Sequence, residues 1–164
     1  MRITFRIGKR RFTFMTAKVT DVHGVNSHVT RGLHLCMWDF DNKSLIAVID
    51  ELRRTQDMYR LPRIFILQTS RGMNYQAFCF TRRPWEQVIA IVGQTFFVDA
   101  NFFKLGVLRG HFTLRTSPKF GYKPELVHVL ASLIPDECTP KQLRHWSRYE
   151  TVDHRGKKSA VIRI

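Results

Sequence analysis

The chain has 164 residues, with 27 Lys and Arg against 13 Asp and Glu, and a formal net charge of +14. Its length suffices for one domain with a sizeable core, so we expect residues 1–164 to form a single domain. Basic residues in every segment predict a polyanionic partner, nucleic acid before an anionic membrane. Three widely spaced cysteines with no C-x-x-C pair argue against a disulfide framework or a structural zinc site.

The first third of the chain reads as strands. Apolar and basic residues alternate over 3–7, and a second apolar run over 12–19 follows a glycine turn, which predicts an opening hairpin. Residues 20–31 are rich in turn-forming side chains and predict a loop. Residues 32–41, GLHLCMWDFD, are largely apolar on both faces of a strand, which predicts a central position in a sheet.

The elements after this strand alternate between helical and strand periods. Residues 43–58 have an apolar helical stripe, and residues 63–70 and 74–81 predict a second hairpin around Gly72. Pro84 suits the first turn of a further helix that ends near Gly93.

The last third predicts two strands and two helices. We expect a long strand over 104–116, a short helix over 125–134, a helix that begins at a capping box after Thr139, and a final strand over 160–164. The sum is an α/β (α+β) fold, with a mostly antiparallel central sheet flanked by helices.

Two carboxylates end the central strand. Asp39 and Asp41 point to the same side, and two negative charges at a sheet edge are unfavourable unless a cation lies between them. The pair therefore indicates a divalent metal site. The alternative is that both are solvated loop residues, with Asp41 or Asn42 capping the next helix.

The order of several motifs resembles that of the archaeo-eukaryotic primase superfamily, the primase-polymerases. That family has a carboxylate pair at a strand end, a turn of small residues and glycine, a later single acid, and an Arg-to-Lys segment. The matching features here are Asp39 with Asp41, residues 70–74, Asp99, and residues 115–119. The resemblance covers residues 32–120, about half of the chain.

The resemblance implies a role for each matching residue. Asp39, Asp41 and Asp99 would be catalytic and would hold Mg²⁺ or Mn²⁺ for phosphoryl transfer, as hard cations and carboxylates suit one another. The residues that would contact the incoming triphosphate are Ser70, Arg71, Gly72, Asn74, Arg115, Ser117 and Lys119. We expect Lys104 and Arg109, in the predicted 104–116 strand, to contact nucleic acid.

The sequence departs from the family at Asn74, where the family turn closes on a histidine. Asparagine can donate a hydrogen bond but cannot be a cation, so it stabilises a polyphosphate less. The turn over 70–74 also fits an ordinary hairpin turn without a ligand. Arg115 and Lys119 equally fit a solvated basic edge strand.

The resemblance implies a nucleotidyltransferase of the DNA primase or polymerase type, acting in plasmid or virus replication. It would bind single-stranded or primed DNA and nucleoside triphosphates. The chain has no phosphate-binding G-x-x-x-x-G-K-[ST] loop, so a helicase or accessory replication subunit would be a separate partner. The first residues lack a signal-peptide pattern, which predicts a soluble cytoplasmic protein without a membrane partner. The alternatives are a non-catalytic nucleic-acid-binding replication module of the same fold, and a metal-dependent nuclease.

Overall fold

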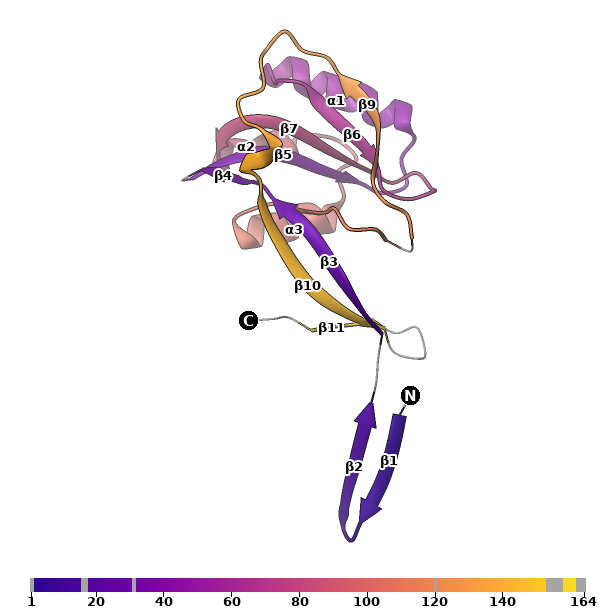
Figure 1. Cartoon of the computed structure of the whole chain (residues 1–164). Coiled ribbons are helices and arrows are strands. Elements are labelled where there is room, and N and C mark those ends of the chain that lie inside the picture. The colour runs from indigo at the N-terminus through magenta and orange to yellow at the C-terminus, as the bar shows by residue number, and fades with distance from the viewer. Residues whose placement is uncertain (1, 16–17, 31, 120, 153–157, 162–164) are drawn as a thin grey trace. The chain divides into compact units, whose positions relative to one another are not determined.

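The structure is a computed structural model that describes residues 2–15, 18–30, 32–119, 121–152 and 158–161. The chain divides into two compact units, of which the smaller joins Met1–His23 to Ser147–Ile164 and the larger is Gly24–Trp146. Figure 1 labels most of the elements of both units. Strands β3 (Lys18–Asn26) and β10 (Arg144–Val152) each run from one unit into the other.

The described residues of the smaller unit form a hairpin and part of a sheet in which β10 lies between β3 and a further strand. β1 (Arg2–Ile7) and β2 (Arg10–Met15) form the predicted antiparallel hairpin, and Gly8 takes a φ of 57° in its turn. β10 pairs with β11 (Lys158–Val161), which begins two residues before the predicted final strand. The end of that prediction, residues 162–164, lies outside the described residues.

The larger unit is built on an antiparallel five-stranded sheet with the order β4-β5-β7-β6-β9. Its strands are β4 (His28–Thr30), β5 (Leu33–Phe40), β6 (Ile64–Gln68), β7 (Tyr75–Pro84) and β9 (Glu125–Leu130). In β5, Met37 on one face and Trp38 on the other are both fully buried. The predicted burial of both faces of this strand and the predicted β6–β7 hairpin are confirmed, but the central strand is β7, and β5 lies next to the edge strand β4.

In the part of the chain that the structure describes, three α-helices accompany the sheet: α1 (Leu45–Tyr59), α2 (Trp85–Gly93) and α3 (Ala100–Arg109). Trp38 Nε1 donates to Thr95 Oγ1 at 3.0 Å, and Thr95 Oγ1 lies 3.3 Å from Thr55 Oγ1 of α1. α1 and the segment after α2 therefore cover the same face of the sheet. The predicted α+β class with antiparallel sheets is confirmed. None of the described helices combines the length and apolar character that a membrane crossing requires.

The predicted strand over 104–116 is wrong. Asp99 begins α3 by accepting the Phe102 N–H at 2.6 Å, and Gly110 ends it with a φ of 72°. Only β8 (Thr113–Arg115) is extended, and it pairs with the end of β3. Phe102 and Phe103 of α3 pack against Phe112, with 4.9 Å between the ring centroids of Phe102 and Phe112.

Three other predictions also differ from the structure. Residues 125–134 contain β9 instead of a helix, since Val129 and its neighbours pair with β6 along its free edge. The capping box at Thr139 forms, with Gln142 Oε1 accepting the Thr139 N–H at 2.9 Å, but it starts only the single 3₁₀ turn Pro140–Gln142. The predicted loop over 20–31 is occupied mainly by β3 and β4.

Candidate functional site

The end of β5 presents the two aspartates at different depths. Asp39 is partly buried and lies across from Gln76 of β7, whose side chain hydrogen-bonds to it. Gln76 is itself only 7% exposed. Asp41 follows the strand and is exposed. Neither Asp41 nor Asn42 caps α1, because the N-cap is Ser44, whose Oγ accepts the Ala47 N–H at 3.2 Å.

The third aspartate comes to the same place from α3. The backbone N–H of Asp99 donates to the carbonyl oxygen of Asp39 at 2.8 Å. The Asp99 Oδ1 accepts the N–H of Phe102 and so caps the helix. This carboxylate therefore has a structural task, while its remaining lone pairs are available to another partner.

The surroundings of Asp39 raise the pKa of its carboxyl group. Burial raises the pKa of the Asp39 carboxyl to about 7, and the negative charges of Asp41 and Asp99 add to that rise. The positive charge of Lys119 and the hydrogen bond from Gln76 have the opposite effect and lower the pKa of Asp39. The end of β5 thus combines three acids and one lysine, and the buried carboxylate has more negative charge around it than positive charge.

The turn between β6 and β7 is attached to the residues that follow the aspartate pair. Asn74 Oδ1 accepts the backbone N–H of Asn42 at 3.1 Å, and the Lys43 N–H donates to the Met73 carbonyl at 3.0 Å. Ser70 Oγ accepts from Asn74 Nδ2 at 3.0 Å and from the Gly72 N–H at 3.2 Å. Ser70 and Asn74 therefore hold the turn itself.

Arg71 and Gly72 lie at the tip of this turn. Both residues are exposed. The carbonyl of Gly72 accepts from Gln68 Nε2 at 3.0 Å, which closes the turn from its strand side. Of the predicted triphosphate contacts here, Arg71 is the exposed cation.

The Arg-to-Lys segment approaches the same turn. Arg115 Nε donates to the Ser117 backbone and side-chain oxygens at 3.2 and 3.1 Å, which shapes the segment after β8. Lys119 forms a backbone bridge with Tyr122, and Tyr122 OH donates to Gln68 Oε1 at 3.4 Å. Ser117 is buried and Lys119 is exposed, so Lys119 is the cation available to a ligand.

The two residues that were predicted to contact nucleic acid from a strand lie on a helix instead. Lys104 and Arg109 are exposed on α3, with Arg109 in the last turn, at the opposite end of the helix from Asp99. They lie on a helix because the predicted 104–116 strand does not form.

Gln76 was missed by the sequence analysis. Its signal was its position two residues after Asn74 on the predicted 74–81 strand.

The donor set fits a hard divalent cation through two carboxylates. Among the described residues, no group of three His, Cys, Asp or Glu side chains is arranged to hold a metal ion. Mg²⁺ is commonly held by one or two carboxylates, with water and substrate phosphates completing its shell. Asp39 and Asp41 match that pattern, and the unbalanced negative charge at Asp39 is what a cation would neutralise.

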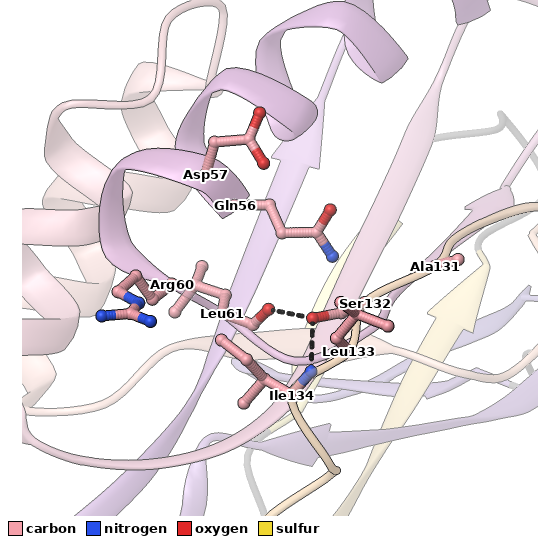
Figure 2. Close-up of a pocket in the computed structure, with 8 residues that line it drawn as sticks. All are labelled: Gln56, Asp57, Arg60, Leu61, Ala131, Ser132, Leu133 and Ile134. Atoms are coloured by element: carbon pink, nitrogen blue, oxygen red, sulfur yellow. Dashed lines mark hydrogen bonds between the residues drawn. The ribbon is translucent and has the colours of Figure 1, made fainter.

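A separate hollow of about 500 Å³ lies at the other end of α1 (Figure 2). It is lined by Gln56, Asp57, Arg60, Leu61, Ala131, Ser132, Leu133 and Ile134. Ser132 Oγ donates to the Leu61 carbonyl at 2.9 Å and accepts the Ile134 N–H at 3.0 Å. Ser132 is engaged in loop hydrogen bonds and Gln56 Nε2 donates to the Pro62 carbonyl at 2.9 Å. The hollow has one acid in its lining while three acids meet at the end of β5, so the end of β5 is the better candidate for chemistry.

The β1–β2 hairpin of the smaller unit is strongly basic. Arg6, Lys9, Arg10 and Arg11 are all exposed. Phe5 and Phe12 stack at 5.4 Å between ring centroids and are 42% and 39% exposed, so they do not form a buried core.

Comparison with known proteins gives no relative: no family model, no curated protein and no solved structure matches this chain.

Proposed function

We propose that the protein is a nucleotidyltransferase of the primase-polymerase type, which extends nucleic acid from nucleoside triphosphates. One observation carries the proposal: the Asp99 N–H donates to the Asp39 carbonyl at 2.8 Å. This contact puts the backbones of the third and the first acidic motif side by side, which supports a site shared by both. Asp39 and Asp41 would hold Mg²⁺ or Mn²⁺, which would activate the primer hydroxyl and stabilise the leaving pyrophosphate.

Three other side chains would bind the phosphates or position Asp39. Arg71, exposed on the turn after β6, offers a planar fork of donors to phosphate oxygens. Lys119 adds a positive charge that acts on Asp39. Gln76 fixes the Asp39 carboxylate by a hydrogen bond, which reduces the reorganisation needed when phosphates arrive.

Primer extension with each aspartate changed tests the proposal. Asp39→Asn and Asp41→Asn should reduce incorporation at least a hundredfold in Mg²⁺ or Mn²⁺. Asp99→Asn keeps a good N-cap for α3, so its loss of incorporation would report the carboxylate instead of the helix. Asp50→Asn, on the exposed face of α1, is the matched control. Unchanged incorporation by Asp39→Asn and Asp99→Asn would reject the assignment.

A second candidate is a non-catalytic nucleic-acid-binding module of the same fold. It is favoured by Asn74, whose side-chain oxygen and nitrogen are both engaged within the protein. Binding to DNA that persists in EDTA, falls steeply with salt and is never accompanied by incorporation would select this function. Degradation of labelled DNA without added nucleotides would instead select a metal-dependent nuclease. A helicase or accessory subunit remains a proposed partner for either replication role.

A further inference from the structure

Two aromatic side chains are exposed immediately before Asp99. Phe96 is 65% exposed and Phe97 is 50% exposed, and their ring centroids lie 6.4 Å apart. They occupy the turn between α2 and α3, in the larger unit that also contains the acidic cluster. Adjacent exposed phenylalanines expose apolar surface that folding alone does not require.

The backbone holds Phe97 in an unfavourable conformation. Its φ is 69°, in the left-handed region that bulky side chains rarely adopt. The turn is fixed on both sides, since the Phe96 N–H donates to Glu51 Oε1 at 2.7 Å and the Asp99 N–H donates to Asp39. Strain that is held by surrounding contacts in this way is typical of sites that position a functional group.

A cation accompanies each ring. Lys43 Nζ lies 5.2 Å from the centroid of the Phe97 ring, and the Arg54 guanidinium lies 5.0 Å from that of Phe96. The backbone N–H of Lys43 is bonded to Met73 in the β6–β7 turn. The Phe97 ring, its lysine and the aspartate pair therefore belong to one connected part of the larger unit.

We infer that Phe97 and Lys43 form a stacking site for a base of single-stranded nucleic acid, beside the acidic cluster. An aromatic ring with a lysine over one face suits a nucleotide, because a base can stack on the other face while its phosphate pairs with the lysine. Single strands fit better than duplex DNA, in which base faces are already stacked. The assignment of nucleic acid as the ligand rests on the proposed function, but the binding itself requires no catalysis.

The test measures binding of a labelled oligo(dT) in EDTA by fluorescence anisotropy. Phe97→Gly should weaken binding about tenfold, the effect of removing one stacking contact. Its melting temperature should equal or exceed that of the wild type, because glycine adopts a positive φ without strain. A ring needed only for folding would give a lower melting temperature and unchanged binding, and that result would overturn the inference.

Two further variants report contact directly. Phe97→Trp keeps the stacking surface, so it should bind as the wild type does and add tryptophan emission that oligo(dT) quenches. Lys43→Gln should weaken binding and reduce the salt dependence by about one ion. Leu133→Ala removes an exposed apolar side chain at the other end of α1 and should change neither property. No added quenching, or equal binding by Phe97→Gly and wild type, rejects the site.

The outcomes separate this inference from the proposed function. If incorporation is absent but Phe97→Gly still binds more weakly, the stacking site stands and the enzyme assignment fails. If incorporation depends on Asp39 but Phe97→Gly binds normally, only the stacking site is wrong.

Discussion

Asn74 Oδ1 accepts the backbone N–H of Asn42 at 3.1 Å, which ties the β6–β7 turn to the chain just beyond the aspartate pair. Asn42 has a φ of 56°, a left-handed conformation that asparagine tolerates better than most residues. The amide group of Asn74 thus holds the geometry of the candidate site. This gives a structural reason for an asparagine at this position of the turn.

Asn74 can be tested by two substitutions with different consequences. Asn74→Ala removes both side-chain hydrogen bonds and should lower the free energy of unfolding by about 1 to 2 kcal/mol. Asn74→Asp keeps the acceptor for the Asn42 N–H, so we expect a smaller loss of stability. Its added negative charge should weaken binding of nucleoside triphosphate. Urea unfolding and nucleotide titration would measure the two effects, and a nucleotide affinity unchanged by Asn74→Asp would place this side chain away from the phosphates.

Asp39→Asn should stabilise the protein above neutral pH. The folded pKa of Asp39, about 7, is above its ordinary value of 3.8, so the folded state holds the proton more tightly. The wild type therefore loses stability as pH rises from about 4 to 7, and the variant does not. Each pKa unit corresponds to about 1.4 kcal/mol, so the gap should reach on the order of a few kcal/mol.

Thermal unfolding of both proteins from pH 4 to pH 8 checks this expectation. Asp50→Asn, which changes the same charge on the exposed face of α1, should show no such gap. A constant difference between Asp39→Asn and wild type across the whole range would contradict the assigned environment of Asp39.

Glu51 should be essential for the turn that contains Phe96. It is 7% exposed, and its carboxylate accepts the Phe96 N–H at 2.7 Å and Arg54 Nε at 3.0 Å. Glu51→Ala leaves both donors without this partner and should cost about 2 kcal/mol of unfolding free energy. Glu51→Gln retains an oxygen for one donor and should cost about half as much. Equal losses in urea unfolding would show that the carboxylate oxygens do not hold the turn.

Gly106 should tolerate no side chain, although it lies within α3. A Cβ there would be 2.2 Å from Cδ1 of Phe112, a residue with no exposed surface. Glycine to alanine ordinarily favours a helix by about 1 kcal/mol, but overpacking costs about 1 to 3 kcal/mol. We therefore expect Gly106→Ala to lower the melting temperature.

A double-mutant cycle with Phe112→Leu identifies the cause of that loss. In the Phe112→Leu background, Gly106→Ala should cost less or become stabilising, because the ring that it meets is gone. If the effects of the two substitutions on stability are additive, the contact between positions 106 and 112 is not the cause of the loss.

Local pattern was sufficient for several elements. The two-sided apolar run of β5, the alternation in β6 and β7, and the helical stripe of α1 each have one clear period, and each element forms as predicted. The patterns failed where an apolar run fits two structures. Residues 125–130 have both helical and strand character, and the free edge of β6 selects the strand.

The positions of the acidic residues could likewise be predicted only in part from the sequence. Asp39 could be placed from the sequence, since it lies in a strand whose sides are set by its alternation, and Asp41 follows directly after that strand. Asp99 could be identified as a candidate but not placed, because its partner is a backbone carbonyl far away in the chain. Its role as the N-cap of α3 was also missed, since α3 was predicted to be a strand.

By itself the sequence determined the basic character of the protein, the strand that leads into the aspartate pair, and the turn over residues 70–74. These depend on composition and on periods of two or 3.6 residues, which are properties of neighbouring side chains. Only the tertiary structure decided that Asp99 and Lys119 come to Asp39, and that Asn74 holds the turn against Asn42. Such contacts depend on packing between distant segments, to which local periodicity gives no access.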